Sequence, residues 1–195
     1  MKKLSLWYPV KPFFLTQGFG LNGEYYRANG INIAGHNGWD LRAYHGQPVR
    51  ASHDGEVVYA GIDGKEGYGV VLRTLEPFEY KDGETFFKTI YWHLLSNIPV
   101  RVGTRVKVGD IIGYADNTGF SNGDHLHFGL KPQYQGENEW TWFNLEDGNG
   151  FFGAIDPQPF FNGFYAEDNQ TVISILQQQI SLLLKVVEIL RLIKK

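Results

Sequence analysis

The sequence predicts a mainly β protein, built as a compact antiparallel sheet and followed by a C-terminal α-helix. The 195 residues include 24 glycines and 8 prolines, many in turn-like clusters, which favours short strands joined by tight turns. A second observation is the series of short apolar segments between residues 36 and 130, mostly separated by Gly, Asp or Asn. A third is a change of composition near residue 168, after which Gly and Pro are absent.

The N-terminal residues 1–20 are expected to supply the first strand, leading into the turn sequence TQGFG. The apolar run of residues 4–10 is short, is interrupted by Ser5 and Pro9, and lacks a small-residue cleavage site. It therefore differs from a signal peptide. No uninterrupted apolar run approaches the length of about 18 residues that a membrane-spanning helix needs, so we expect no membrane span.

The middle of the chain has the period of short β-strands. After an expected loop at residues 21–35, the apolar alternating segments are QPVRAS, GEVVYAGI, YGVVLRTL, FFKTIYWHL, TRVKVGDIIGYA and HLHFGLK. This is the pattern of a compact antiparallel sheet or barrel. Residues 132–167 are aromatic, rich in Gly, Asn and Pro, and without a clear period. We expect them to pack on the domain as an ordered loop or as an insertion that shapes a cleft.

Residues 168–195 are predicted to form one amphipathic helix, with Asp168 or Asn169 as its N-cap. Apolar residues follow alternating spacings of three and four, as in a coiled-coil seam. They are Ile173, Leu176, Ile180, Leu183, Val187 and Leu190. A second apolar row lies beside this seam, so the helix should self-associate or dock on a larger assembly.

Net charge and cysteine content limit the classes of function and of metal site that the chain can have. The net charge is −3, from 18 basic and 21 acidic residues, so the chain lacks the basic excess expected for binding nucleic acid. There is no cysteine, which excludes disulfides and thiolate ligands. Any metal must therefore be bound by His, Asp or Glu.

Two histidines stand two positions apart in the segment SNGDHLHFGL. Because successive side chains of a strand point to opposite faces, His125 and His127 should share one face while Leu126 and Phe128 point into a core. Both imidazoles could reach one metal, or one could bind the metal while the other moves protons. An isolated pair of this kind is more often part of a solvated strand face, so its meaning depends on other residues.

Those other residues lie in HNGWD and YWHLL. The first segment places His36 four residues before Asp40, and the second places His93 at the end of an apolar alternating stretch. A catalytic zinc takes three protein ligands and a water in a tetrahedral arrangement. His36, Asp40 and one histidine of the HLH pair would supply the three ligands, leaving His93 and the other histidine for acid–base chemistry.

Together these segments resemble the lysostaphin/LytM-type zinc endopeptidases, which cut peptidoglycan. TQGFG is similar to the family's entry turn, HNGWDLRAYHGQPVRASHDGEVVYAG to its HxxxD block, and TIYWHLL to its YxHL segment. VRVGTRVKVGDIIGYADNTGFSNGDHLHFGL resembles its closing hairpin and HLHF block. The resemblance covers residues 9–131 and implies a metallopeptidase domain over residues 1–131. Its fold would be an antiparallel sheet of the barrel-sandwich type, with a groove that crosses the metal.

The resemblance also implies the roles of individual residues. His36, Asp40 and His127 match the family's zinc ligands, whereas His93 and His125 match its two catalytic histidines outside the metal shell. The substrate would be a peptide bond in the cross-bridge or stem peptide of bacterial peptidoglycan. The sequence leaves open which of the two catalytic histidines is the general base.

The sequence also departs from the family and leaves alternatives open. Gly129 stands where the family commonly has an acidic residue, at a position that is not a ligand, and His45 and His53 lie in turn-like segments where we expect surface residues. The alternative function is a non-catalytic peptidoglycan-binding or virion structural module, although such modules typically lose zinc ligands. A biotinyl or lipoyl carrier has a similar hairpin, but its exposed tip lysine is missing here.

The expected place of action is the bacterial cell wall. With no signal peptide recognised, a phage lysin released by lysis, or an enzyme carried on a virion tail, would reach the wall without an export signal. The predicted helix at residues 168–195 favours the tail-associated version, because a heptad seam can trimerise or dock the enzyme. A cellular protein exported by another route is the remaining alternative.

Deleting residues 168–195 should leave a folded, active and monomeric hydrolase, whereas the full chain should self-associate. The reason is that each large aliphatic side chain gains about 1.5–3 kcal/mol on burial, which an isolated helix in water cannot realise. Sedimentation of both proteins at micromolar concentration measures the difference. A monomeric full-length chain would contradict self-association.

Overall fold

A computed structural model of the chain describes residues 2–138 and 141–161. Within these ranges the strands form a nine-stranded sheet and a separate two-stranded sheet, and all strand pairs are antiparallel. The predicted mainly β, antiparallel fold is thus confirmed. The helix predicted for residues 168–195 lies outside the described residues.

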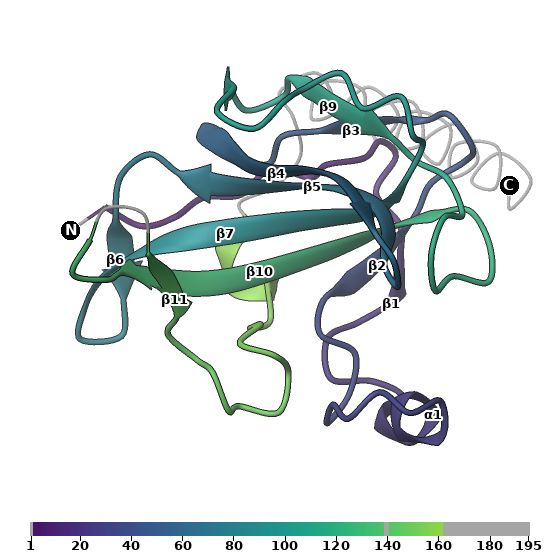
Figure 1. The fold of residues 1–195 in the computed structure, drawn as a ribbon, viewed down its shortest axis with the longest axis horizontal. Coiled ribbons are helices and arrows are strands. Elements are labelled where there is room, and N and C mark those ends of the chain that lie inside the picture. The colour runs from purple at the N-terminus through teal and green to yellow at the C-terminus, as the bar shows by residue number, and fades with distance from the viewer. Residues whose placement is uncertain (1, 139–140, 162–195) are drawn as a thin grey trace, which may run out of the picture. The chain divides into compact units, whose positions relative to one another are not determined.

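The large sheet is built around four long neighbouring strands, β10 (His125–Gln135), β7 (Gly83–Leu94), β5 (Gly67–Thr74) and β4 (Gly55–Asp63). Its other strands are β1 (Leu15–Gln17), β2 (Trp39–Arg42), β6 (Phe78–Tyr80), β8 (Arg105–Val106) and β11 (Trp142–Asn144). Their order is β1-β2-β10-β7-β5-β4-β8, with β6 beside β7 and β11 beside β10. The small sheet pairs β3 (Pro48–Arg50) with β9 (Ile111–Tyr114). Figure 1 shows the long strands β5, β7 and β10 side by side.

The core lies on one face of the large sheet. Alternate residues of β10, β7 and β5 are fully buried there, and they pack against β3, β9 and the N-terminal segment in one hydrophobic cluster. Its members include Leu126, Phe128, Leu130, Tyr91, Leu72, Val49, Ile112 and Leu6. The opposite face of the large sheet, called here the outer face, carries the intervening residues. The predicted split of β10 into a buried Leu126–Phe128 side and a His125–His127 side is confirmed.

The predicted N-terminal strand is wrong for residues 4–10. This segment forms only one isolated bridge, between Leu6 and Phe161. Its backbone bonds go to two different segments, because the Leu6 amide donates to Phe160 O and the Trp7 amide to Ser52 O. No continuous ladder can form with two partners, yet the apolar side chains still enter the core. The first strand is instead β1, next to the predicted turn.

Two other segments have more regular structure than expected. The loop predicted at residues 21–35 contains a short helix, α1 (Gly23–Ala28), on which both tyrosines of the segment lie. Beyond residue 131, β10 continues to Gln135, pairs with β11, and is followed by a short 3-10 helix, η1 (Gln158–Phe160). Phe160 and Phe161 pack against the core cluster.

His53 is not the surface residue that the sequence predicted. It is 5% exposed, and its ring contacts Asp54 O at 2.8 Å and Thr89 Oγ1 at 2.8 Å. Burial lowers its pKa. Its partner Thr89 is distant in sequence, which is why its segment alone resembled an exposed turn. His45 is exposed as expected, and its Nδ1 lies 2.8 Å from Asp116 Oδ1.

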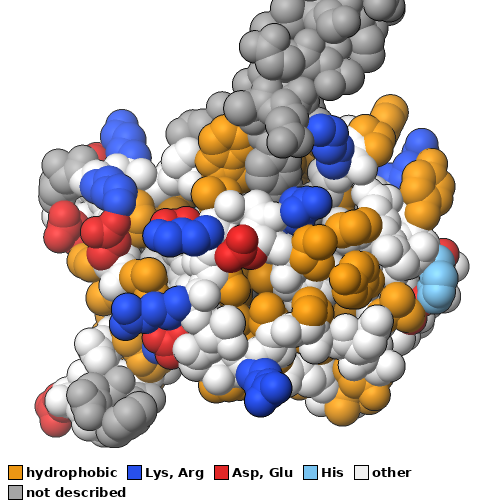
Figure 2. All heavy atoms as spheres, turned by 90° about the horizontal axis from the view of Figure 1, so that it is seen from above, with side chains coloured by type: hydrophobic (Ala, Val, Ile, Leu, Met, Phe, Trp, Pro, Cys, Tyr) orange, Lys and Arg blue, Asp and Glu red, His pale blue; other side chains and the backbone are white. Residues whose placement is uncertain are grey.

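The surface has no uniform charge on the face drawn in Figure 2. Lysine and arginine side chains are interspersed there with acidic and hydrophobic ones, in line with the small net charge of −3. Among the helices in the described part of the chain, none is long and apolar enough to cross a membrane.

Candidate metal centre and active site

The pairing of β2 with β10 brings together residues that are far apart in sequence. Asp40 is directly opposite His127 in this antiparallel pair, as Leu41 is opposite Leu126. Directly opposite residues point to the same face, so Asp40 and His127 emerge together on the outer face. His36 precedes β2 and is held by two backbone bonds, from its amide to Leu21 O and from the Gly20 amide to its carbonyl.

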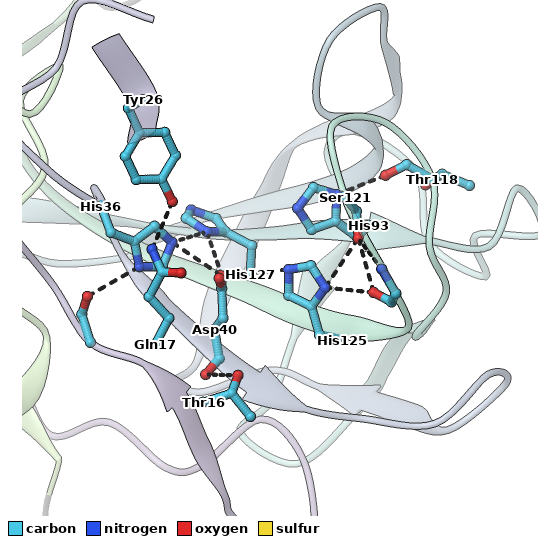
Figure 3. Close-up of polar contacts among 12 residues, drawn as sticks. Thr16, Gln17, Tyr26, His36, Asp40, His93, Thr118, Ser121, His125 and His127 are labelled. Carbon is cyan, nitrogen blue, oxygen red and sulfur yellow. Dashed lines mark hydrogen bonds and ion pairs between the residues drawn. The ribbon is translucent and has the colours of Figure 1, made fainter. Parts of the chain in front are cut away.

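Three donor atoms from these residues converge. His36 Nε2 lies 2.9 Å from His127 Nδ1 and 3.1 Å from Asp40 Oδ1, and His127 Nδ1 lies 3.1 Å from Asp40 Oδ1. Figure 3 shows the three side chains pointing toward one another. Tetrahedral zinc with bonds of about 2.0–2.2 Å would set its ligand atoms about 3.3 Å apart. The three residues can therefore hold a metal ion.

The tautomer of His36 fits this role. Its Nδ1 lies 3.2 Å from the carbonyl oxygen of Gly18, to which it can only donate. A neutral His36 then presents the lone pair of Nε2 to the centre, which is how a carbonyl partner orients a metal-binding histidine. Tyr26 of α1 stacks on the same ring, with an interplanar angle of 5°, so the ring is fixed on two sides.

Asp40 is the only carboxylate of this group, and three histidines surround it. Burial would raise its pKa, but the close contacts of its carboxylate with the rings of His125, His127 and His36 outweigh burial and hold the pKa well below its usual range. Asp40 is therefore ionised. Its negative charge adds to the attraction of the site for a cation.

His93 and His125 lie beside the metal-binding group. Their ring centroids are 4.6 Å apart, and His125 Nε2 is 3.5 Å from Asp40 Oδ1. His93 Nδ1 donates to Thr118 O at 2.7 Å, and His125 Nδ1 to Gly123 O at 2.8 Å. In each neutral ring, Nε2 is then the unprotonated nitrogen. Burial lowers the pKa of His93 to about 4. Burial would also lower the pKa of His125, but the nearby carboxylate of Asp40 outweighs burial, and the pKa of His125 is raised.

The backbone of His93 has an unusual conformation. Its φ is +65°, in the left-handed region that non-glycine residues rarely adopt. The register of β5 and β7 also shifts at this point. In a regular strand His93 would share a face with Tyr91, which lies in the core; the irregularity turns His93 toward the outer face instead. Strain of this kind often marks functional sites.

A groove of about 430 Å³ contains all five histidine and aspartate residues of the site. One wall comes from α1 and the residues after it, and the other from residues 120–124. The two walls meet where Asn122 Nδ2 lies 3.4 Å from the hydroxyl of Tyr25. The structure therefore brings the five sequence-predicted residues into one groove.

The sequence missed the groups that orient the histidines. Three are backbone carbonyls, those of Gly18, Thr118 and Gly123, and a carbonyl leaves no side-chain signal in a sequence. A fourth is the hydroxyl of Ser121, whose Oγ lies 3.2 Å from His125 Nδ1. The stacked Tyr26 could have been found only from the fold.

Comparison with known proteins gives a consistent result. The sequence profile of peptidase family M23 matches residues 34–139. Glycyl-glycine endopeptidase ALE-1 of Staphylococcus capitis is 42% identical over 99 residues, which make up 51% of this chain but 25% of ALE-1. The chain therefore spans about a quarter of the length of this relative.

Solved structures share the fold. The catalytic domain of lysostaphin from Staphylococcus simulans superimposes with a TM-score of 0.55 and 31% identity, over 76% of this chain and 91% of that domain. A zinc-containing peptidase from Vibrio cholerae gives a TM-score of 0.54 and 26% identity, over 80% of this chain and 41% of that one.

A divalent first-row metal should stabilise the chain through His36, Asp40 and His127. At a hundredfold excess over Kd the gain is about 2.7 kcal/mol, or roughly 5–10 °C in melting temperature. The measurement is thermal unfolding with and without metal. Asp40→Ala and His127→Ala should each abolish the increase in melting temperature that the metal causes. His45→Ala, in a second His/Asp group with Asp116 and Asp124, is the control. A shift lost in the control but kept in Asp40→Ala would contradict the assignment.

Proposed function

The chain belongs to peptidase family M23, and on this basis we propose that it is a zinc-dependent endopeptidase that hydrolyses peptide bonds of bacterial peptidoglycan. The observation that carries the proposal is the convergence of His36 Nε2, Asp40 Oδ1 and His127 Nδ1 within 3.1 Å in a groove. The non-catalytic alternative gains no support, because no ligand or catalytic position of the resemblance is lost.

The donor set fits zinc. Two imidazole nitrogens and one carboxylate oxygen are borderline and hard donors of the kind found in catalytic zinc sites, where three protein ligands leave one position open. When bound, zinc supplies a Lewis acid that activates water and polarises the scissile carbonyl. With Asp40 as the single anionic ligand, the site keeps a net positive charge.

His93 and His125 handle protons. Each Nδ1 is committed to a backbone carbonyl, so each Nε2 can exchange a proton with the reacting groups. With its pKa at about 4, His93 is neutral near pH 7 and can accept a proton. A protonated partner can then hydrogen-bond the developing oxyanion or protonate the leaving amine. Because His125 has a raised pKa, it is suited to the donor role.

The substrate is an extended peptide rather than a compact ligand. The five reactive side chains line the groove together with residues of α1 and of the segment 120–124. Substrate selection in such folds lies in loops of this kind. We place the action at the bacterial cell wall, with a glycine-containing bridge or a D-amino-acid link as the bond cut, and a phage lysin or tail enzyme as the origin.

His93→Ala and His125→Ala should each lower turnover by about 10²–10⁴-fold while the protein keeps about one zinc per chain. The reason is that both side chains act on protons and neither belongs to the ligand group. Elemental analysis and hydrolysis assays on the same preparations separate the two effects. Zinc lost in His125→Ala but retained in His127→Ala would reverse the assignment within the HLH pair.

The protein should release new amine ends from purified peptidoglycan. Mass spectrometry of digests from several cross-bridge types identifies the bond, and a chelator should stop the reaction until zinc is returned. Asp40→Ala serves as the metal-free control. If no peptidoglycan type yields new amine ends from zinc-loaded protein, the proposed function is wrong.

A further inference from the structure

Three basic residues form one row across the outer face of the large sheet. Lys131 of β10 is in register with Lys88 of β7, and Lys88 with Arg73 of β5, three strands that lie side by side in Figure 1. Directly opposite Cβ atoms in antiparallel strands are about 4.5–5.5 Å apart. The three side chains, called here the cationic row, are therefore neighbours.

Within residues 2–138 and 141–161, the cationic row has no acidic partner at ion-pair distance. Asp147, Glu66 and Glu56 attract the row only at longer range. The Arg73 guanidinium lies 3.8 Å from the centre of the Trp142 ring, and this stacking leaves the N–H groups at its edge available.

The row is unfavourable for the folded chain. All three side chains are partly buried, and burial together with the neighbouring Lys131 lowers the pKa of Lys88 to about 8. Like charges directly opposite on adjacent strands destabilise a sheet. Natural proteins keep such local violations mainly at functional sites, and here an anion would supply the missing partner.

The cationic row lies on the same face as the metal-binding group. His127, Gly129 and Lys131 share this face of β10, and the glycine between the other two adds no side chain. Four residues of β10 span about 13 Å at 3.3 Å per residue. An extended peptide advances about 3.3–3.6 Å per residue, so a group about four residues from a bond at the metal would reach the row.

We propose that the cationic row of Lys131, Lys88 and Arg73 binds a carboxylate of a peptidoglycan stem peptide whose attached cross-bridge has its scissile bond at the metal group. This inference rests on the proposed function. Stem peptides carry free carboxylates on D-glutamate and on a terminal D-alanine, so the charge is complementary. A guanidinium can hold a carboxylate through two parallel N–H donors, and two ammonium groups add compact positive charge.

The test uses the full-length protein and two forms of one peptide. The peptide L-Ala–D-Glu–L-Lys–D-Ala is titrated with its carboxylates free and with them amidated, and binding is measured by calorimetry. Lys88→Met and Lys131→Met should each weaken binding of the free peptide about tenfold and leave the amidated peptide unaffected. Lys3→Met, at an exposed position, is the matched control and should change neither.

Two further measurements separate a binding role from a structural one. Without peptide, Lys88→Met should melt at the same temperature as the parent or higher, because a repulsive charge is removed. In peptidoglycan hydrolysis, KM should rise while kcat and zinc content stay unchanged. If the lysine variants instead lose kcat and melt at a lower temperature, the cationic row has a structural role and the proposal is wrong.

The outcomes also separate this proposal from the proposed function. If the parent protein hydrolyses peptidoglycan but both lysine variants keep the parent's peptide affinity and KM, the proposed role of the cationic row is wrong and the proposed function stands. Carboxylate-dependent peptide binding without any cleavage supports the row and contradicts the function. A glycerol-phosphate polymer serves as a second anionic probe: if the variants weaken only its binding, the row recognises a wall polymer and the proposal is wrong.

Discussion

The site depends on the register of β10 between β2 and β7. A shift by one residue would turn His125 and His127 into the core and expose Leu126 and Phe128, because the side chains of a strand alternate. Both apolar side chains are fully buried, and each gains about 1.5–3 kcal/mol from burial. The same packing therefore fixes the core and aligns His127 with Asp40, so the hydrophobic side of β10 determines the chemistry of its other side.

Alternation along one strand could be predicted from sequence, but departures from it could not. His125 and His127 obeyed the period of two and were predicted on one face. His93 and Tyr91 have the same spacing, yet Tyr91 lies in the core and His93 in the groove, because the backbone of His93 has φ +65°. Nothing in YWHLL signals this conformation. The buried position of His53 was missed for a different reason, since its partner comes from a distant strand.

The metal-binding group is already assembled in the protein's own contacts. Gly18 orients His36, the carboxylate of Asp40 accepts hydrogen bonds from its neighbours, and backbone carbonyls hold His93 and His125. These contacts leave little rearrangement for ligand binding, which is the usual advantage of a preorganised site. They also explain why the sequence identified the reactive residues but not their supports: reactive groups are side chains, whereas most supports are peptide carbonyls.

The two faces of the large sheet have opposite energetic roles. On the inner face, burial of Leu126, Phe128 and Leu130 stabilises the fold. On the outer face, a left-handed backbone at His93 and a row of like charges oppose stability, by about 1–3 kcal/mol for the strained residue and up to about 1 kcal/mol for each like-charged pair. Because the strained residue and the cationic row lie on one face, and the row begins about 13 Å along β10 from His127, the two features mark one continuous surface along which an extended ligand would lie.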